Sequence, residues 1–269
     1  MRFGAPVFDA YTTAEQWAMA HKKYGYNAAY CPIGADRLEL AGEYMAASAK
    51  YDIVIAEVGA WSNPMSKNPG DRKKAVEHCK TQLHLADEIG ARCCVNIAGN
   101  LGEPWDGHSV ENLTKKAFDQ IVETTRDIID SVNPKRTFYT LEMMPWMYPC
   151  DEDSYLELIR AIDRRQFAVH LDVVNIVNSP VKYYDTPKVI KSCFAKLGGH
   201  IKSIHVKDIT MPQKMTVHLE EIICGRGNFC HKTLIEEVRK CDENIPMMLE
   251  HLSSKEEYIE AGEYFKGLF

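Results

Sequence analysis

The sequence predicts a closed barrel of eight parallel strands, each followed by a helix, formed as one domain by residues 1–269. Short apolar or β-branched runs alternate with stretches of helical period along the whole chain. This alternation favours parallel pairing, because a crossover between parallel strands needs a helix. About eight such units in 269 residues fit the size of a (β/α)8, or TIM, barrel.

The predicted strands are short runs rich in Val, Ile, Ala and aromatic residues, bounded by polar or glycine-containing segments. An open, doubly wound sheet is the alternative arrangement, but no strand is followed by the glycine-rich turn that such folds use to bind nucleotides. No linker or low-complexity segment divides the chain. The strands are expected at 3–8, 27–31, 52–60, 92–99, 136–144, 167–175, 201–209 and 246–252.

The predicted helices show apolar residues at a spacing of three and four positions. Their ends carry local signals, such as Thr13 and Gln16 in capping-box spacing, Gly25 and Gly90 as stops, and Pro134 after a long amphipathic stretch. The helices are expected at 13–25, 35–50, 71–91, 109–132, 154–163, 186–199, 231–241 and 254–268.

Composition excludes several classes of function. The net charge is −6 and no basic stripe is present, so nucleic acid is not an expected partner. The sequence has no apolar run long enough to span a membrane and no secretory leader, which predicts no membrane partner. Nine cysteines without a CxxC pair indicate reduced thiols and a cytoplasmic location.

Polar side chains near the ends of the last four strands form the candidate site, because TIM-barrel chemistry takes place where the strands end. Each of these strands contributes a carboxylate or an imidazole. Other polar residues near strand ends are Glu57, Asn96, Asn100 and Asp208. The residues expected to converge on one point are Glu142, Asp172, His205 and Glu250.

Three carboxylates and one imidazole form a hard, mixed ligand set that suits one divalent ion, Mn²⁺ first, with Mg²⁺ or Co²⁺ as alternatives. Each position also has a structural interpretation. A glutamate at a strand end is usually solvated, His205 lies among apolar residues as a core histidine would, and Asp172 is placed to cap the following helix.

At "LEMMPW", "HLDVVN", "IHVKDI" and "MLEHL" the sequence resembles the xylose-isomerase-like superfamily of (β/α)8 sugar isomerases and epimerases. The resemblance extends over the whole chain and includes the "GRG" turn, Gly225 to Gly227. It implies one divalent ion held by Glu142, Asp172, His205 and Glu250. In ketose 3-epimerases of this superfamily the two glutamates also exchange the substrate proton, which implies catalytic roles for Glu142 and Glu250.

The sequence departs from those epimerases at two positions. Asn175 stands where they have His, and Met211 stands where they have Arg; both residues hold substrate hydroxyls in the epimerases. The block "HLDVVNIVNSP" is similar to catalytic subunits of C-glycoside deglycosidases, which act on 3-oxo-glucosides together with a small β-sandwich partner subunit. The resemblance therefore implies a metal-dependent lyase that releases an aglycone, with a sugar isomerase or ketose 3-epimerase as the alternative.

All of these enzymes remove a proton from the carbon next to a carbonyl group. His170, two residues before Asp172 on the same strand face, is a further candidate base or a residue that orients a ligand. Lys207 is expected to bind a substrate oxygen, or else to pair with Asp172 or Glu250. Trp105, His108, Trp146 and Asn175 are the other expected substrate-binding residues, and Trp61 is expected to pack in its loop.

Two other classes of function are compatible with this fold. A metal-dependent apurinic endonuclease would need more metal-binding histidines and a basic face for DNA, and both are missing from the sequence. A barrel that serves as a non-catalytic binding subunit is the second, and the sequence leaves self-association open as well.

Overall fold

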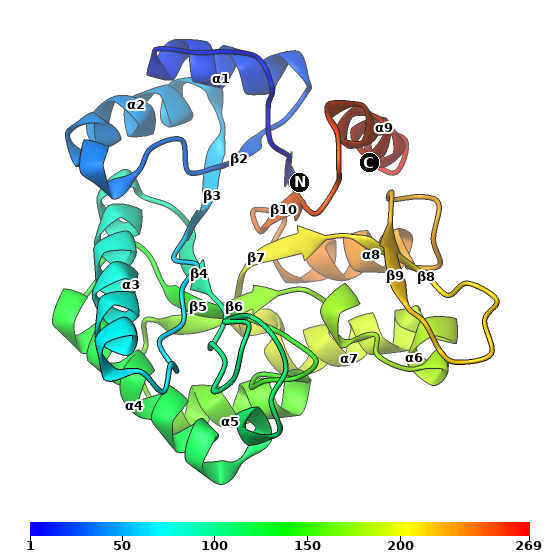
Figure 1. Cartoon of the computed structure of the whole chain (residues 1–269). Helices are drawn as coiled ribbons and strands as arrows, with labels where there is room; N and C mark the ends of the chain where they lie inside the picture. The colour runs from blue at the N-terminus through cyan, green and yellow to red at the C-terminus, as the bar shows by residue number, and fades with distance from the viewer.

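The computed structural model describes residues 1–269 and confirms the predicted TIM barrel. Eight parallel strands form one sheet around a central axis, and the helices lie outside it (Figure 1). Around the sheet the strands follow the order β1-β10-β7-β6-β5-β4-β3-β2. They are β1 (Arg2–Gly4), β2 (Ala28–Tyr30), β3 (Val54–Gly59), β4 (Cys93–Asn96), β5 (Tyr139–Glu142), β6 (Phe167–Leu171), β7 (Ile201–Val206) and β10 (Pro246–Leu249).

The barrel closes where β1 meets β2. The backbone N–H of Asn27 donates to the carbonyl of Phe3 at 3.0 Å, and the Asn27 side chain accepts from the Phe3 N–H at 2.7 Å. A side chain at Gly4 would place its first carbon 2.0 Å from the carbonyl oxygen of Ala28. Only glycine allows the two strands to approach this closely, so Gly4 helps to close the ring.

The helices cover the outer face of the barrel and bury their apolar sides against it (Figure 1). Several begin at a side-chain cap, such as Thr13, Asn68, Thr114 and Ser254. The helices are α1 (Ala14–Lys23), α2 (Ala41–Tyr51), α3 (Pro69–Ile89), α4 (Lys115–Val132), α5 (Glu152–Ile162), α6 (Pro180–Tyr184), α7 (Thr186–Leu197), α8 (His231–Cys241) and α9 (Lys255–Lys266). Short 3₁₀ turns lie at Ala35–Leu40, Val110–Leu113, Val174–Ile176 and Gly198–His200.

The seventh strand is shorter than predicted. The run 201–209 was expected to form one strand, but β7 ends at Val206. Asp208–Thr210 then forms β8, which pairs antiparallel with β9 (Glu220–Ile222). This hairpin projects from the edge of the barrel (Figure 1). The apolar pattern continues through both strands, so it does not mark the break between them.

Asp208 is a structural residue in this region. Its buried carboxylate accepts hydrogen bonds from the backbone N–H groups of Ile209, Gly225, Gly227 and Phe229 at 2.8–3.0 Å. A side chain at Gly227 would meet an Asp208 oxygen at 2.2 Å. The "GRG" turn therefore wraps around one carboxylate and holds the base of the hairpin.

Tyr155 joins α5 to the two strands that carry Glu142 and Asp172. Its hydroxyl is completely buried, 2.6 Å from the carbonyl oxygen of Leu141 and 2.9 Å from that of Ala168. It also accepts from the Leu141 N–H at 3.1 Å. Because these groups are shielded from water, losing the hydroxyl leaves strand backbone without a partner.

Replacing Tyr155 with Phe is expected to lower the free energy of unfolding by about 1–3 kcal/mol, the usual cost of a buried polar group left unpaired. Urea denaturation of the two proteins measures this difference. The control is Tyr184→Phe, because Tyr184 is 69% exposed. Equal urea midpoints for Tyr155→Phe and Tyr184→Phe would show that the Tyr155 hydroxyl does not stabilise β5 and β6.

All nine cysteines are free thiols in the structure, and Cys79, Cys93, Cys94, Cys193 and Cys224 are buried. None of the helices combines the length and the apolar character that crossing a lipid bilayer requires.

Candidate metal centre

Four side chains from consecutive strands meet at the C-terminal mouth of the barrel. Glu142 is the last residue of β5, Asp172 directly follows β6, His205 lies in β7, and Glu250 directly follows β10. One ligand atom from each lies within 4.8 Å of the others. Glu142, Asp172 and His205 are buried, and the Glu250 side chain is 17% exposed. The barrel thus brings together the four residues that were expected to converge.

His205 presents one ring nitrogen to this cluster. Its Nδ1 lies 2.9 Å from Glu250 Oε2 and 3.2 Å from Glu142 Oε1. Burial by itself lowers the pKa of His205, but the carboxylates of Glu250, Glu57 and Glu142 raise it well above its ordinary value. Without an ion, a proton on Nδ1 therefore balances part of the acidic charge.

Lys207 lies inside the cluster. Its ammonium group is 2.9 Å from Asp172 Oδ2, 3.4 Å from Glu250 Oε2 and 3.1 Å from Glu221 Oε1. Only 2% of its side chain is exposed. Of the two interpretations of Lys207, the structure shows the ion pair, and it shows it with both Asp172 and Glu250.

Two carboxylate oxygens of this cluster lie beside cationic groups. Asp172 Oδ2 and Glu250 Oε2 are buried, and the groups nearest to them are cationic: Lys207 Nζ lies 2.9 and 3.4 Å away, and His205 Nδ1 lies 2.9 Å from Glu250 Oε2. Buried carboxylate oxygens normally accept hydrogen bonds or coordinate a metal ion. Together with Glu142 and His205 Nδ1, these oxygens form a hard donor set that fits a divalent cation.

The three carboxylates differ in how readily they ionise. Burial raises the pKa of Glu142 and of Glu250, but the positive charge of His205 has the larger effect and lowers both. The pKa of Glu250 falls to about 2. Burial dominates at Asp172 and raises its pKa to about 6 despite the nearby Lys207 charge. At neutral pH the cluster therefore carries negative charge that attracts a cation.

Asn175 connects the acidic ligands to Lys207. Its Nδ2 donates to Glu142 Oε1 at 3.0 Å, and its Oδ1 accepts from Lys207 Nζ at 2.9 Å. Its backbone N–H donates to Asp172 Oδ1 at 3.1 Å. The amide expected to contact substrate is thus already bonded within the protein, where it orients Glu142.

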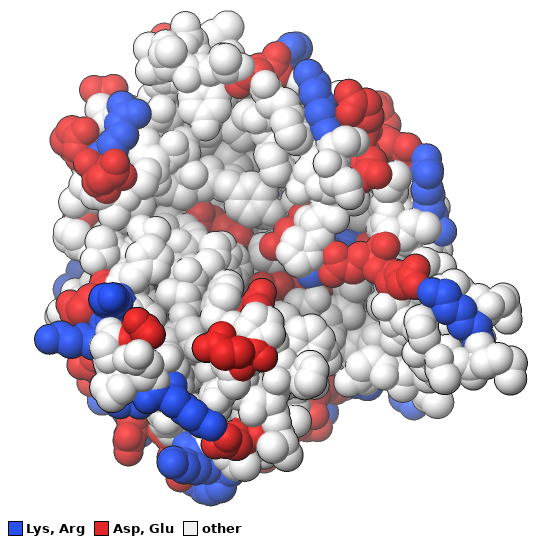
Figure 2. Space-filling model, viewed as in Figure 1, with Lys and Arg blue, Asp and Glu red and all other residues white.

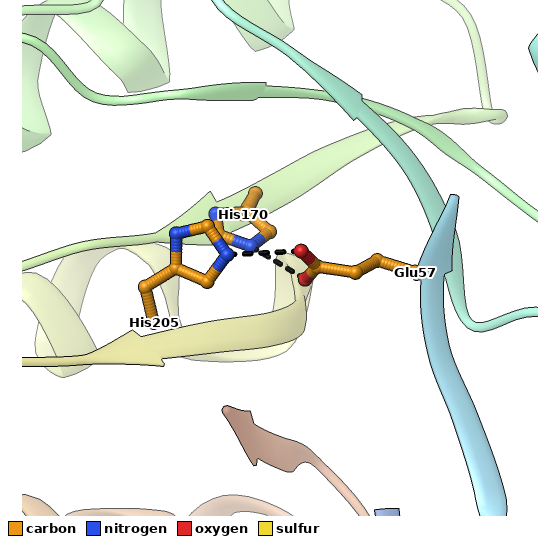
Figure 3. Close-up of side chains that lie close together, drawn as sticks. All are labelled: Glu57, His170 and His205. Atoms are coloured by element: carbon orange, nitrogen blue, oxygen red, sulfur yellow. Dashed lines mark hydrogen bonds and ion pairs between the residues drawn. The ribbon is translucent and has the colours of Figure 1, made fainter. Parts of the chain in front are cut away.

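His170 is not placed as a general base. The side chain is completely buried, its Nε2 lies 2.9 Å from Glu57 Oε2, and its Nδ1 has no partner (Figure 3). A base must reach the substrate carbon through at most one water molecule, and this buried ring does not line the cavity beside Glu250. Of its two expected roles, the geometry fits the one in which His170 orients other residues.

A cavity of about 620 Å³ opens beside Glu250. Aromatic side chains from three parts of the barrel line it: Tyr30 at the end of β2, Trp61 after β3 and Tyr258 in α9. Figure 2 shows the corresponding face, hollowed at its centre with acidic side chains at the bottom. The apolar walls and the carboxylate floor suit a small polar ligand that carries an apolar group.

The expected substrate-binding residues of two loops lie elsewhere on this face. Trp105 and His108 belong to the loop after β4 and Trp146 to the loop after β5, and none of them lines the cavity beside Glu250. Trp146 instead donates to the carbonyl of Asp106 at 3.0 Å, which ties the two loops together. Trp61, which was expected to pack in its loop, lines the cavity and is 42% exposed.

Sequence reasoning missed three residues at the mouth. Tyr30 is the last residue of β2, and its hydroxyl donates to the carbonyl of Leu249 beside Glu250 at 3.0 Å. Glu221, in β9, pairs with Lys207, and Tyr258 comes from a helix. The aromatic residue at a strand end was a usable signal for Tyr30, whereas nothing in the local sequence marks Glu221 or Tyr258.

Comparisons with known proteins agree with this fold. Residues 19–268 match the family described as xylose isomerase-like TIM barrel. None of the curated proteins matches the chain in sequence. A xylose isomerase-like TIM barrel protein from Mycobacterium smegmatis, solved in complex with magnesium, is similar in structure, with a TM-score of 0.68 at 15% identity over 99% of this chain and 95% of the other.

Two further solved structures are similar at low sequence identity. The probable 3-DHS dehydratase AsbF from Bacillus anthracis has a TM-score of 0.72 at 16% identity, over 100% of this chain and 98% of the other. The 3-keto-D-glucoside 4-epimerase YcjR from E. coli has a TM-score of 0.69 at 13% identity, over 100% and 98%. At these identities the similarity establishes the fold.

Proposed function

Because the chain belongs to the xylose isomerase-like TIM barrel family, we propose that it is a divalent-metal-dependent lyase that releases the aglycone from a 3-oxo-glycoside. The observation that carries this proposal is the buried cluster of Glu142, Asp172, His205 and Glu250, whose ligand atoms converge beside an aromatic-lined cavity. A sugar isomerase or ketose 3-epimerase that uses the same ligands is the runner-up.

The proposed ligands are carboxylate oxygens of Glu142, Asp172 and Glu250 together with Nδ1 of His205. The oxygen-rich set favours Mn²⁺, with Mg²⁺ or Co²⁺ as alternatives. When bound, the ion would supply positive charge that stabilises the oxygens of an enediolate. The solved magnesium complex of a protein with this fold supports a divalent ion here.

Glu250 is the proposed base. It is the only one of the four ligands that lines the cavity, and its low pKa of about 2 keeps it ionised at neutral pH. Glu142 is the second candidate, because its carboxylate ends β5 in the same cluster. Lys207 is the proposed donor of a hydrogen bond to an anionic substrate oxygen, and the position of its ammonium group among the proposed ligands supports this role.

The proposed reaction is an elimination. The base takes the proton from the carbon next to the carbonyl, and the electrons of that C–H bond form the enediolate. These electrons then form a double bond to the neighbouring carbon, whose bond to the aglycone breaks. The departing group keeps the bonding pair and takes up a proton, so the products are an unsaturated keto sugar and the free aglycone.

Two positions favour elimination over epimerisation. Asn175 and Met211 replace the His and Arg that hold sugar hydroxyls in the similar epimerases, and the Asn175 amide is bonded to Glu142 and Lys207. Losing a hydrogen bond between a hydroxyl and a charged group costs about 1.5–3 kcal/mol, or roughly ten- to a hundred-fold in rate. Free ketohexoses are therefore expected to be poor substrates.

The Mn²⁺-loaded protein is expected to release aglycone from an aryl 3-oxo-glucoside, measured by chromatography. In D₂O, deuterium should enter the position next to the carbonyl in recovered substrate. Free fructose, tagatose and psicose, tested in parallel, should epimerise slowly or not at all. Rapid epimerisation of a ketose without release of any aglycone would replace the proposed lyase with the runner-up.

A partner subunit is part of the same test. The resemblance implies a small β-sandwich protein beside the barrel, so the assay is run with and without the products of neighbouring genes. A barrel that bound metal and sugar but turned over neither substrate class in any combination would instead be a binding subunit.

Metal affinity is expected to fall as the pH falls. Protons compete with the ion for Asp172, whose pKa of about 6 makes this carboxylate largely protonated at about pH 5; this alone weakens binding about tenfold relative to about pH 7. The raised pKa of His205 adds a second competing proton over the same range. Calorimetric titration with Mn²⁺ measures the trend, and an affinity independent of pH would contradict the assignment of these ligands.

A further inference from the structure

Behind the four proposed ligands lies a second buried cluster, formed by Glu57 of β3, His170 of β6, and His205 with Ser203 of β7 (Figure 3). The Glu57 carboxylate points across the barrel interior toward both imidazole rings. Its side chain is 3% exposed, so water does not solvate the charge. A buried carboxylate needs hydrogen-bond donors, and here the donors come from β6 and β7, across the barrel from β3.

Each oxygen of Glu57 has its own donors. Oε1 lies 2.9 Å from Nε2 of His205. Oε2 lies 2.9 Å from Nε2 of His170 and 2.9 Å from the Ser203 hydroxyl. Since an ionised carboxylate only accepts hydrogen bonds, both Nε2 atoms must carry a proton.

This arrangement decides which nitrogen of His205 is available as a ligand. An imidazole that binds a metal ion is neutral, so it carries one ring proton. With that proton on Nε2 facing Glu57, the lone pair lies on Nδ1, which faces Glu142 and Glu250. With the proton on Nδ1 instead, it would point at the ion and block coordination.

His170 supports the same assignment. Its Nδ1 is buried without a partner. An unpaired N–H there would be costly, whereas a bare lone pair is the state that results when Nε2 donates to Glu57. The ring also packs edge-on against His205, with centroids 4.1 Å apart, and so limits the rotation of that imidazole.

We propose that Glu57 is a positioning residue that holds the Nε2 proton of His205 and thereby keeps Nδ1 free to bind the ion. The proposal rests on the metal centre of the proposed function. Hydrogen bonds to the far nitrogen of a ligating histidine commonly change metal affinity ten- to a hundred-fold. Glu57 acts on the ion through His205, while His170 and Ser203 donate to its other oxygen.

The same three groups also have the composition of a metal site, since Glu57, His170 and His205 offer ligand atoms within 4.8 Å of one another. The two interpretations differ in the number of ions. Protons on both Nε2 atoms leave Glu57 saturated and allow one ion per chain, whereas a second ion would require both protons to leave.

The variant Glu57→Gln tests the proposal, because the amide keeps the shape of the side chain but offers one acceptor where the carboxylate has two. The control is Ser203→Ala, which removes a donor to Glu57 without touching His205. Titration with Mn²⁺ should show ten- to a hundred-fold weaker binding for Glu57→Gln and less than about threefold for Ser203→Ala. Thermal denaturation checks that both variants fold.

A second measurement shows directly which ring nitrogen of His205 carries the proton. In protein labelled with ¹⁵N-histidine and saturated with diamagnetic Mg²⁺, long-range ¹H–¹⁵N spectra should show His205 protonated on Nε2, and metal analysis should give one ion per chain. In Glu57→Gln, the spectra should show a share of His205 protonated on Nδ1.

Three results would overturn the proposal: Glu57→Gln that binds Mn²⁺ as the wild type does, wild-type His205 protonated on Nδ1, or two ions per chain. Equal losses of affinity in Glu57→Gln and Ser203→Ala would also contradict it, because they would indicate general disruption of the buried cluster. Wild-type protein that binds no divalent ion would remove the proposed function and this inference together.

Discussion

The variants Glu142→Gln and Asp172→Asn are expected to lose Mn²⁺ binding by more than about a hundredfold and to abolish turnover. Each change replaces a proposed carboxylate ligand with a neutral amide. Direct ligands contribute more than the ten- to hundred-fold that is typical of the groups hydrogen-bonded to them. Neither side chain can be replaced by a neighbour, because both are buried at fixed strand ends. Metal analysis after gel filtration and calorimetric titration provide the measurement.

Glu43→Gln is the matched control, because it makes the same chemical change at an exposed position of α2. It should keep both metal content and activity. If Glu142→Gln or Asp172→Asn retained full metal content and turnover, these side chains would not be ligands.

Lys207→Met is expected to change metal binding and turnover in opposite directions. The ammonium group lies 2.9 Å from Asp172 and 3.4 Å from Glu250, so it competes with a cation for the same oxygens. Removing this charge should strengthen Mn²⁺ binding by at least about tenfold, because like charges repel strongly where water is scarce. Turnover should fall by about a hundredfold or more, since the proposed donor to the anionic substrate oxygen is lost.

The stability of Lys207→Met should depend on the ion. Without metal, the carboxylates lose their internal cation, which costs about 3–5 kcal/mol for a broken buried pair. A bound divalent ion replaces that charge, so saturating Mn²⁺ should raise the melting temperature more in this variant than in the wild type.

Lys214→Met provides the comparison, since Lys214 forms an ion pair with Glu220 near the same hairpin but is 47% exposed. It should match the wild type in Mn²⁺ affinity, in turnover and in the rise of melting temperature with Mn²⁺. Weaker metal binding by Lys207→Met would show that Lys207 organises the ligands, and unchanged turnover would show that it does not contact the substrate.

The fold could be predicted because its signals are local and repeated. Each of the eight predicted strands overlaps a strand of the barrel, and α8 has the predicted bounds, 231–241. Other boundaries moved by a few residues: α3 begins at Pro69, because Asn68 caps it, where the apolar period suggested 71. Capping and strand pairing depend on single contacts, which a periodic pattern does not specify.

The sequence by itself determined the barrel and the four residues that would converge, because strands of one parallel barrel place their last residues at the same mouth. Only the tertiary structure decided what surrounds them. Strand spacing left Lys207 with two interpretations, a substrate contact or an ion pair with Asp172 or Glu250, and only the structure shows the pair. Strand spacing gave no sign that His170 turns toward Glu57, on a strand three places away in the sheet.

The residues that line the cavity also could not be predicted from the sequence. Tyr30, Trp61 and Tyr258 line it although 228 positions separate the first from the last in the sequence. The physical reason is that closing the ring at Gly4 brings β2 and β3 close to β10, with β1 between β2 and β10 in the sheet. Periodicity fixes which face of a strand is buried, but which distant side chains meet there depends on the curvature and closure of the whole sheet.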